Sequence, residues 1–236
     1  MRPTLKAAAS RLVALSTIVL GLAVLAAASD GDTTDSAKRL KASADVLNQI
    51  MSSTDKNIPP EVLSEAKCIA VIPSLVKVAL GVGGRHGKGM ATCRTRNGWS
   101  APGPINISGG SIGLQIGSQT VDVVLIILDE HAFTELLSSK FKIGGDVAGS
   151  PGPIGKQSSV NDWHKAEILM YSKSHGVFAG VNLKGAAVKQ DKDSTVELYG
   201  RYIPIGSILA GKVPPPAESH EFLAVVRKYV AEARHS

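Results

Sequence analysis

Short β-branched segments separated by glycines fill the centre of this 236-residue chain and limit its fold more than any other feature. Between Cys68 and Leu128 the apolar residues alternate with polar ones or form short runs, which is typical of strands. The pattern continues through Glu167–Tyr171, Val177–Leu183 and Ala186–Lys189. Because strands and helices do not alternate regularly here, we expect an antiparallel-rich sheet rather than a doubly wound parallel one.

Amphipathic helices are predicted at both ends of this strand-rich centre. The first helix spans about Asp35–Ser53, with one apolar and one polar stripe, and a short second helix spans Pro60–Ala66. The last helix follows three prolines, and its apolar residues recur at helical spacing over Phe222–Val230. Two shorter helical segments are expected at Glu130–Ser138 and Ser194–Tyr199. The predicted fold class is therefore α+β, an antiparallel-rich β domain with amphipathic helices at the N- and C-terminal ends.

The first 28 residues have the layout of a secretory signal peptide. Arg2, Lys6 and Arg11 precede an uncharged run that ends in the small-residue spacing Ala26-x-Ala28. An uncleaved membrane anchor is the alternative, since this run is close to the lower length limit for a membrane span. We divide the chain into a signal peptide (residues 1–28), an N-terminal helical segment (29–65) and a β domain with a C-terminal helix (66–236).

Composition excludes several classes of protein. A hydrophobic fraction of 44% is too high for a disordered tail. The formal net charge of +6 falls to +3 when residues 1–28 are removed, because that segment carries three basic residues and no acidic ones. Such a mild excess does not indicate a nucleic-acid-binding protein.

The two cysteines, Cys68 and Cys93, are predicted to form a disulfide, because an exported protein folds in an oxidising compartment. Glycines between them, among them Gly81 and Gly84, supply a turn that would bring the flanking strands together. A metal site is less favoured, since no His-x-x-x-His or Cys-x-x-Cys pattern accompanies the cysteines. We expect no metal and no cofactor.

The glycine-rich segment Gly81–Gly89 invites comparison with phosphate-binding loops. A Walker loop needs Ser or Thr after Gly-Lys, but Gly89 follows Lys88, and Val82 occupies the position of the first glycine. Two interpretations stay open. The segment is either a plain glycine-rich turn between strands or a hairpin tip that contacts anions through Arg85, His86 and Lys88.

Ser111 lies in a Gly-x-Ser-x-Gly sequence, which is typical of a serine hydrolase nucleophile. That motif requires a strand before the serine and a helix after it, whereas the residues that follow Ser111 indicate another strand. We therefore assign no catalytic role to Ser111 and expect the serine to lie at a glycine-rich strand edge.

Several blocks in series resemble the SYLF domain. They include AKCIAVIPSLVKVALGVGGRHGKGMATCR, GWSAPGPINISGGSIGLQIGSQTVDVVLIILDE, KFKIGGDVAGSPGPIGK and AEILMYSKSHGVFAGVNLKGA, followed by LYG. SYLF domains occur in actin-patch proteins with SH3 domains and in exported bacterial proteins. The resemblance implies a lipid-binding module without enzymatic activity, because eukaryotic members bind phosphoinositide membranes and some bind actin filaments.

By position, the resemblance implies lipid contacts at two places. One is the basic side of the first helix, with Lys38, Arg39 and Lys41, whose apolar side would insert into the membrane. The other is the basic glycine-rich turn, with Arg85 and Lys88.

Two functional hypotheses follow. The first is an exported protein, periplasmic, envelope-associated or secreted, that binds anionic phospholipid or phosphoinositide headgroups peripherally and without catalysis. The alternative is a structural or interaction protein of the bacterial envelope that binds another protein.

Overall fold

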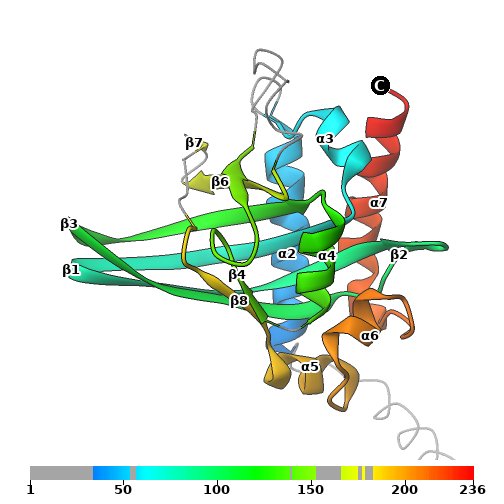
Figure 1. The fold of residues 1–236 in the computed structure, drawn as a ribbon. Coiled ribbons are helices and arrows are strands. Elements are labelled where there is room, and N and C mark those ends of the chain that lie inside the picture. The colour runs from blue at the N-terminus through cyan, green and yellow to red at the C-terminus, as the bar shows by residue number, and fades with distance from the viewer. Residues whose placement is uncertain (1–33, 54–56, 139, 153–165, 175–176, 179–182) are drawn as a thin grey trace, which may run out of the picture. The chain divides into compact units, whose positions relative to one another are not determined.

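The computed structural model describes residues 34–236 except 54–56, 139, 153–165, 175–176 and 179–182, with backbone alone at 79–82, 111–116 and 177–178 (Figure 1). The signal peptide predicted at residues 1–28 lies outside the described residues, as does part of the strand predicted at Val177–Leu183. Among the helices of the described part, none combines the length and the apolar character that a membrane crossing needs.

Helices occupy both ends of the described chain, as predicted. They are α2 (Asp35–Met51), α3 (Pro60–Glu65), α4 (Glu130–Leu137), α5 (Lys192–Tyr199), α6 (Ile205–Leu209) and α7 (His220–Arg234), with a 3-10 turn η2 at Ala217–Ser219. The strands are β1 (Cys68–Thr95), β2 (Gly98–Trp99), β3 (Gly103–Ile127), β4 (Lys140–Lys142), β5 (Gly149–Pro151), β6 (Ile168–Ser174), β7 (Val177–Phe178) and β8 (Ala187–Gln190). This composition confirms the α+β fold class.

The sheet is built on the antiparallel pair of the two long strands, β1 and β3. The second half of β3 pairs with β6, while its first half pairs with β8, which in turn pairs with β4. These pairs are all antiparallel, and β5 adds a parallel pairing to β6. The prediction of an antiparallel-rich sheet is therefore confirmed.

Strand β1 folds back on itself. A disulfide joins Cys68 near its start to Cys93 near its end, and their Cα atoms lie 4.0 Å apart although 25 positions separate them. A straight strand of that length would span roughly 80 Å. The reversal falls near the middle, where the pairing with β3 shifts register between Leu80 and Gly81. The β1–β3 ribbon thus doubles over at the end that projects away from the helices (Figure 1), and the sheet is curled.

The glycine-rich segment is not the turn between two hairpin strands that the sequence predicted. It is extended within β1, and Gly81–Gly89 pairs with residues 105–113 of β3. The chain does reverse between the cysteines, but it does so by bending a two-stranded ribbon. Two of the glycines are needed for close approach: a Cβ at Gly89 would lie 2.2 Å from the carbonyl oxygen of Val71, and one at Gly87 would lie 2.8 Å from Ile72 Cγ2.

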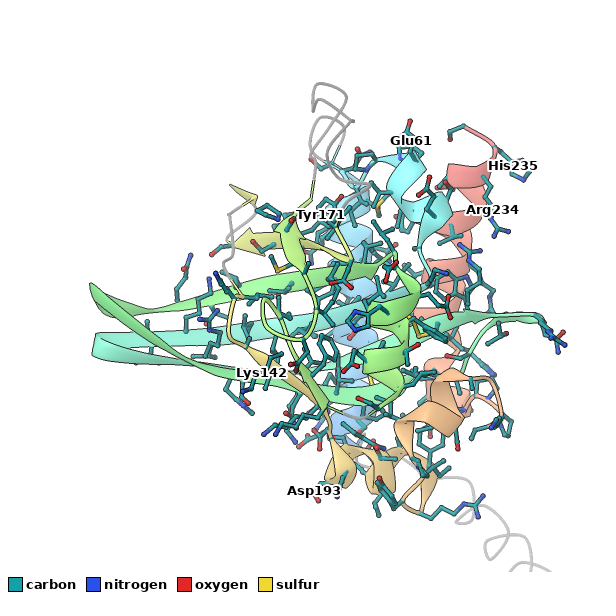
Figure 2. All side chains as sticks on the ribbon, viewed as in Figure 1. Glu61, Lys142, Tyr171, Asp193, Arg234 and His235 are labelled. Carbon is teal, nitrogen blue, oxygen red and sulfur yellow. A yellow bond between two sulfur atoms is a disulfide. The ribbon has the colours of Figure 1, made fainter. Side chains whose placement is uncertain are left out.

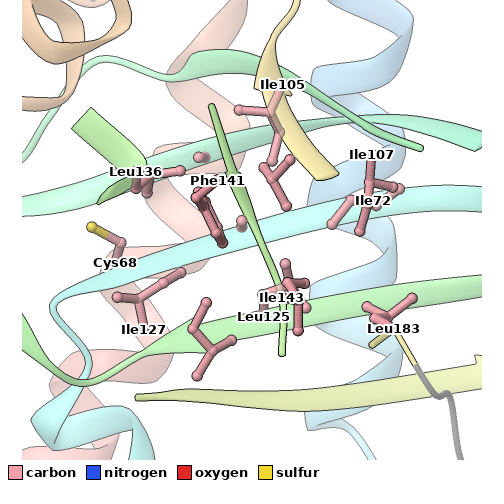
Figure 3. Packing of buried hydrophobic residues seen from close by; sticks show 14 of the residues in the cluster. Cys68, Ile72, Ile105, Ile107, Leu125, Ile127, Leu136, Phe141, Ile143 and Leu183 are labelled. Atoms are coloured by element: carbon pink, nitrogen blue, oxygen red, sulfur yellow. The ribbon is translucent and has the colours of Figure 1, made fainter. Parts of the chain in front are cut away.

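Alternate residues of the long strands face two hydrophobic cores, as the period of a strand requires. Cys68, Ile72, Leu125 and Ile127 point into the curl, where Phe141 of β4 packs against them (Figure 3). The residues between them face the other way, toward a core shared with helices α2, α3 and α7; they include Ile69, Val71, Val124 and Ile126.

Helices α2 and α7 are adjacent although they lie at opposite ends of the described chain (Figure 1). Leu40 and Leu47 of α2 share one buried core with Phe222 and Val226 of α7. Both apolar stripes predicted from the sequence are therefore used for packing inside the protein.

Candidate functional site

Two of the predicted lipid-contacting residues, Lys38 and Lys41, lie exposed on helix α2. Lys38 Nζ is 3.7 Å from Asp35 Oδ1, and Lys41 Nζ is 3.2 Å from Asp45 Oδ2. The hydrogen bond to Asp45 raises the pKa of Lys41. Both lysines are therefore accessible, but neighbouring carboxylates neutralise them, which weakens their attraction to a distant anion.

The apolar side of α2 is not available for insertion into a membrane in this structure. Leu40, Ala44, Leu47 and Ile50 have no exposed surface. Burying such side chains contributes about 1.5–3 kcal/mol for each large one, so the helix would have to leave the core at considerable cost before it could insert. The expectation of apolar insertion by this helix is therefore wrong for the folded state.

Arg39 and Lys88 belong to one network of hydrogen bonds and an ion pair around Asp191. The sequence had placed Arg39 in the helix contact and Lys88 in the glycine-rich turn. Lys88 Nζ lies 2.8 Å from Asp191 Oδ2. The same carboxylate oxygen accepts a hydrogen bond from Ser194 Oγ at 2.8 Å, and Arg39 Nη1 donates to Ser194 Oγ at 3.1 Å. This network joins β1, α5 and α2.

Asp191 is the centre of the network and is only 4% exposed. Burial alone would raise the pKa of Asp191, but the hydrogen bonds from Lys88 and Ser194 outweigh burial, and the net effect is a lowered pKa. Its Oδ1 also accepts from the N–H of Ser194 and so caps helix α5. Lys88 therefore balances a buried charge, and we interpret it as a structural residue.

Helix α5 also holds the start of α2 through Glu197. The side chain of Glu197 accepts hydrogen bonds from the hydroxyl of Ser36 and from the backbone N–H groups of Asp35 and Ser36. The hydrogen bond from Ser36 is the main cause of the lowered pKa of Glu197. These bonds satisfy donors at the first turn of α2, where a negative charge is also favourable.

Arg85 lies in the folded part of the β1–β3 ribbon rather than at an exposed turn. Its Nη2 donates to the carbonyl oxygens of Gly110 at 3.4 Å and Lys184 at 3.5 Å. Burial lowers the pKa of Arg85. Burial also lowers the pKa of Lys77, and the positive charge of Arg85 lowers the pKa of Lys77 further. Arg85 and Lys88 therefore do not form one basic turn. Arg85 donates to backbone carbonyl oxygens, whereas Lys88 pairs with buried Asp191.

Three lysines that the sequence analysis did not single out share one exposed surface, which we call the lysine face: Lys140, Lys142 and Lys189. In β4 the two lysines point outward on either side of buried Phe141, and Lys140 stands directly opposite Lys189 in the β4–β8 pair. Lys142 is labelled in Figure 2. Within the described part of the chain, none of the three forms an ion pair. The alternation Lys-Phe-Lys at 140–142 could have indicated two outward-facing lysines on a strand. The sequence does not show that this strand pairs with the one that carries Lys189.

Ser111 lies inside β3, where it pairs with Gly83 of β1. A nucleophile elbow requires a tight turn from a strand into a helix at the serine. The backbone at Ser111 is instead extended, so this motif does not have the geometry of a hydrolase nucleophile.

Asp129, His131 and Glu167 form a cluster of potential metal ligands, with atoms within 4.8 Å of one another. These groups already bond to each other: His131 Nδ1 lies 2.6 Å from Glu167 Oε1, and the backbone N–H of His131 donates to Asp129 Oδ1 at 2.7 Å. The hydrogen bond to Glu167 raises the pKa of His131, which favours an imidazolium that repels a cation. The cluster therefore suits a charged hydrogen bond better than a metal ion.

Comparison with known proteins gives a consistent result. Residues 108–229 match the family model Ysc84, described as Las17-binding protein actin regulator. LAS seventeen-binding protein 3 of Saccharomyces cerevisiae is 34% identical over 193 residues, which cover 78% of this chain and 41% of the yeast protein. SH3 domain-containing YSC84-like protein 1 of Homo sapiens is 30% identical over 198 residues, which cover 80% of this chain and 58% of the human protein. The chain thus spans about two-fifths of the yeast relative. No solved structure matches it.

Proposed function

The chain belongs to the Ysc84 family, the family of the SYLF resemblance, and from this premise we propose that its domain binds anionic membrane surfaces without catalysing a reaction. The yeast relative and the family description carry the name of a binding protein, and none of the names given above is that of an enzyme. The proposed ligands are anionic phospholipid or phosphoinositide headgroups, bound peripherally.

The lysine face is the observation that carries this proposal. Like charges directly opposite each other in a sheet destabilise it, and Lys140 stands opposite Lys189 without an acidic partner among the described residues. An anionic surface would remove that repulsion. The outward direction of all three lysines leaves their ammonium groups accessible to a flat surface.

The expected affinity is modest. Each Lys or Arg near an anionic membrane contributes about 1 kcal/mol, so the lysine face alone gives a weak association. Salt screens such contacts, because the Debye length is only about 8 Å at physiological ionic strength. Exposed Lys38 and Lys41 are proposed as secondary contacts, whereas Arg39, Arg85 and Lys88 mainly stabilise the fold.

Flotation of the purified protein with vesicles tests the proposal. We expect binding to vesicles that contain phosphatidylglycerol, little binding to phosphatidylcholine vesicles, and release when the salt concentration is raised. Equal binding to both kinds of vesicle, or binding that salt does not weaken, would contradict an electrostatic contact.

A protein partner is the second candidate function. The yeast relative is named for binding another protein, LAS seventeen, and Val76 and Val78 of this chain are 40% and 44% exposed on β1. Exposed apolar side chains of this kind suit a protein interface. If the protein fails to float with any vesicle, this candidate is favoured over the first.

We further propose that the protein is exported and acts in the periplasm, at the cell envelope or outside the cell. The signal-like layout of residues 1–28 and the disulfide between Cys68 and Cys93 support this proposal. Mass spectrometry of protein from the periplasmic fraction tests it. A mature protein that begins after Ala28 is expected, and a cytoplasmic full-length protein with two free thiols would contradict it.

A further inference from the structure

A basic cavity of about 1,090 Å³ lies between the β1–β2 hairpin, helix α4 and the segment that follows α6. Its basic side chains are Lys67, Arg94, Arg96 and Lys212, against a single acidic side chain, Glu130. None of these residues belongs to the lysine face. The cavity is therefore a separate cationic feature of the same domain.

The disulfide fixes two of these cations side by side. Lys67 precedes Cys68 and Arg94 follows Cys93, so the cross-link between the cysteines also joins the backbone at the two basic residues. The N–H of Arg94 donates to the carbonyl oxygen of Lys67 at 2.7 Å, which extends this connection. The cavity thus has a rigid wall at Arg94, whereas the charge of neighbouring Lys67 is balanced by Glu130, whose Oε2 lies 2.6 Å from Lys67 Nζ.

Arg94 is a partly buried cation without a carboxylate partner in the described part of the chain. Its Nε donates to the carbonyl oxygen of Ala66 at 3.1 Å, and its Nη2 donates to that of Ser64 at 3.2 Å. Burial lowers the pKa of Arg94, and the charge of Arg234 acts in the same direction. An anion in the cavity would stabilise this guanidinium, because a desolvated charge is costly until an opposite charge approaches it.

Apolar side chains form the rest of the lining. The Arg94 guanidinium carbon lies 5.1 Å from the centroid of the Trp99 ring, and Phe133, Leu209 and Val213 border the same space. A ligand that fits both parts of the lining combines an anionic group with an apolar or aromatic body.

We propose that this cavity binds a small amphipathic ligand that carries a phosphomonoester group, with the phosphate at Arg94, Arg96 and Lys212 and the apolar body against Trp99. A phosphomonoester carries a charge of about −1.5 to −2 at neutral pH, which matches the cationic excess of the lining better than the single charge of a carboxylate. Arginine also binds phosphate through two parallel hydrogen bonds, and exposed Arg96 is the one proposed to do so, because Nε and Nη2 of Arg94 already donate to carbonyl oxygens. The ligand is either a soluble phosphate ester or the headgroup of a lipid.

Calorimetric titration with two probes tests the proposal and separates the two sources. Phenyl phosphate represents a soluble ester, and dihexanoyl phosphatidic acid represents a lipid headgroup; phenol and dihexanoyl phosphatidylcholine are their controls without a phosphomonoester. Binding of either phosphate probe, but of neither control, supports the site, and the tighter probe identifies the source.

Arg96→Gln and Lys212→Gln remove exposed side chains, so both variants should fold. Each is expected to weaken binding roughly tenfold, as for the loss of one charge-assisted hydrogen bond.

Lys192→Gln is the matched control, because it removes one exposed positive charge outside both the cavity and the lysine face and should leave the affinity for both probes unchanged. The proposal is overturned if neither phosphate probe binds, or if the Arg96→Gln/Lys212→Gln double variant binds as the parent does. Inorganic phosphate that binds as tightly as phenyl phosphate would show a plain anion site and overturn the amphipathic assignment. The double variant should still float with phosphatidylglycerol vesicles, which lack a phosphomonoester, so failure here is distinguishable from failure of the proposed function.

Discussion

Lys88 Nζ lies 2.8 Å from Asp191 Oδ2, and this ion pair attaches the glycine-rich part of β1 to the start of helix α5. The pair is asymmetric, because the side chain of Asp191 is 5% exposed and that of Lys88 is 39% exposed. Lys88, which the sequence analysis assigned to a lipid contact, therefore balances the buried carboxylate of Asp191 in the folded protein.

Lys88→Gln is expected to destabilise the protein by about 1–2 kcal/mol, since it leaves Asp191 buried without its counter-charge. The loss is smaller than for a fully buried pair because water screens the partly exposed lysine. Urea unfolding of the variant and the parent measures the difference. Lys192→Gln removes an exposed lysine from the first turn of helix α5 and should change the stability by less than about 0.5 kcal/mol.

The contribution of Asp191 should depend on pH in an acidic window. Its pKa in the folded protein is lowered from an ordinary value of 3.8, so its stabilising effect is present above that value. The effect is lost as the pH falls below 3.8 and through the lower pKa of the folded state. The difference in unfolding free energy between the parent and Asp191→Asn should therefore be constant near neutral pH and shrink below about pH 4. A difference that grows on acidification would contradict the ion pair.

Gly89→Ala is expected to destabilise the protein by about 2 kcal/mol or more, because the new Cβ would lie 2.2 Å from the carbonyl oxygen of Val71, a backbone atom that cannot move alone. Gly110→Ala is the control, since its Cβ would lie 3.9 Å from the nearest atom. Thermal unfolding of the two variants measures the contrast. Equal melting temperatures would mean that the two halves of β1 do not pack as closely as described.

The period of the apolar residues was sufficient to predict helices α2, α3, α4, α5 and α7 and most strands, but the five-residue helix α6 was not predicted. The stripe that includes Leu40 and Leu47 is helical, and alternation places Ile69 and Val71 on one side of β1. The glycines misled the prediction because glycine serves equally in a turn and where two backbones approach closely. That choice depends on contacts such as Gly89 with Val71, which no local pattern records.

The candidate site was less predictable, because charge alone does not reveal partners that are distant in the sequence. Lys88 and Lys189 both look like exposed basic residues in the sequence, but Lys88 pairs with buried Asp191 while Lys189 stands opposite Lys140. The difference arises from contacts between segments that are distant in the sequence: β4 pairs with β8 and sets Lys140 opposite Lys189, whereas Lys88 of β1 reaches Asp191, the residue after β8. Sequence reasoning could find the cations but not separate structural ones from accessible ones.

The central claim is that the lysine face contacts anionic membranes, and flotation of two matched triple variants tests it most directly. One variant replaces Lys140, Lys142 and Lys189 by glutamine, and the other replaces exposed Lys38, Lys41 and Lys228, so both lose the same charge. With phosphatidylglycerol vesicles at low salt, the first variant should lose most of the binding and the second should retain most of it. Equal loss in both variants would mean that net charge alone drives binding, and a greater loss in the second would place the contact on the exposed faces of helices α2 and α7 instead.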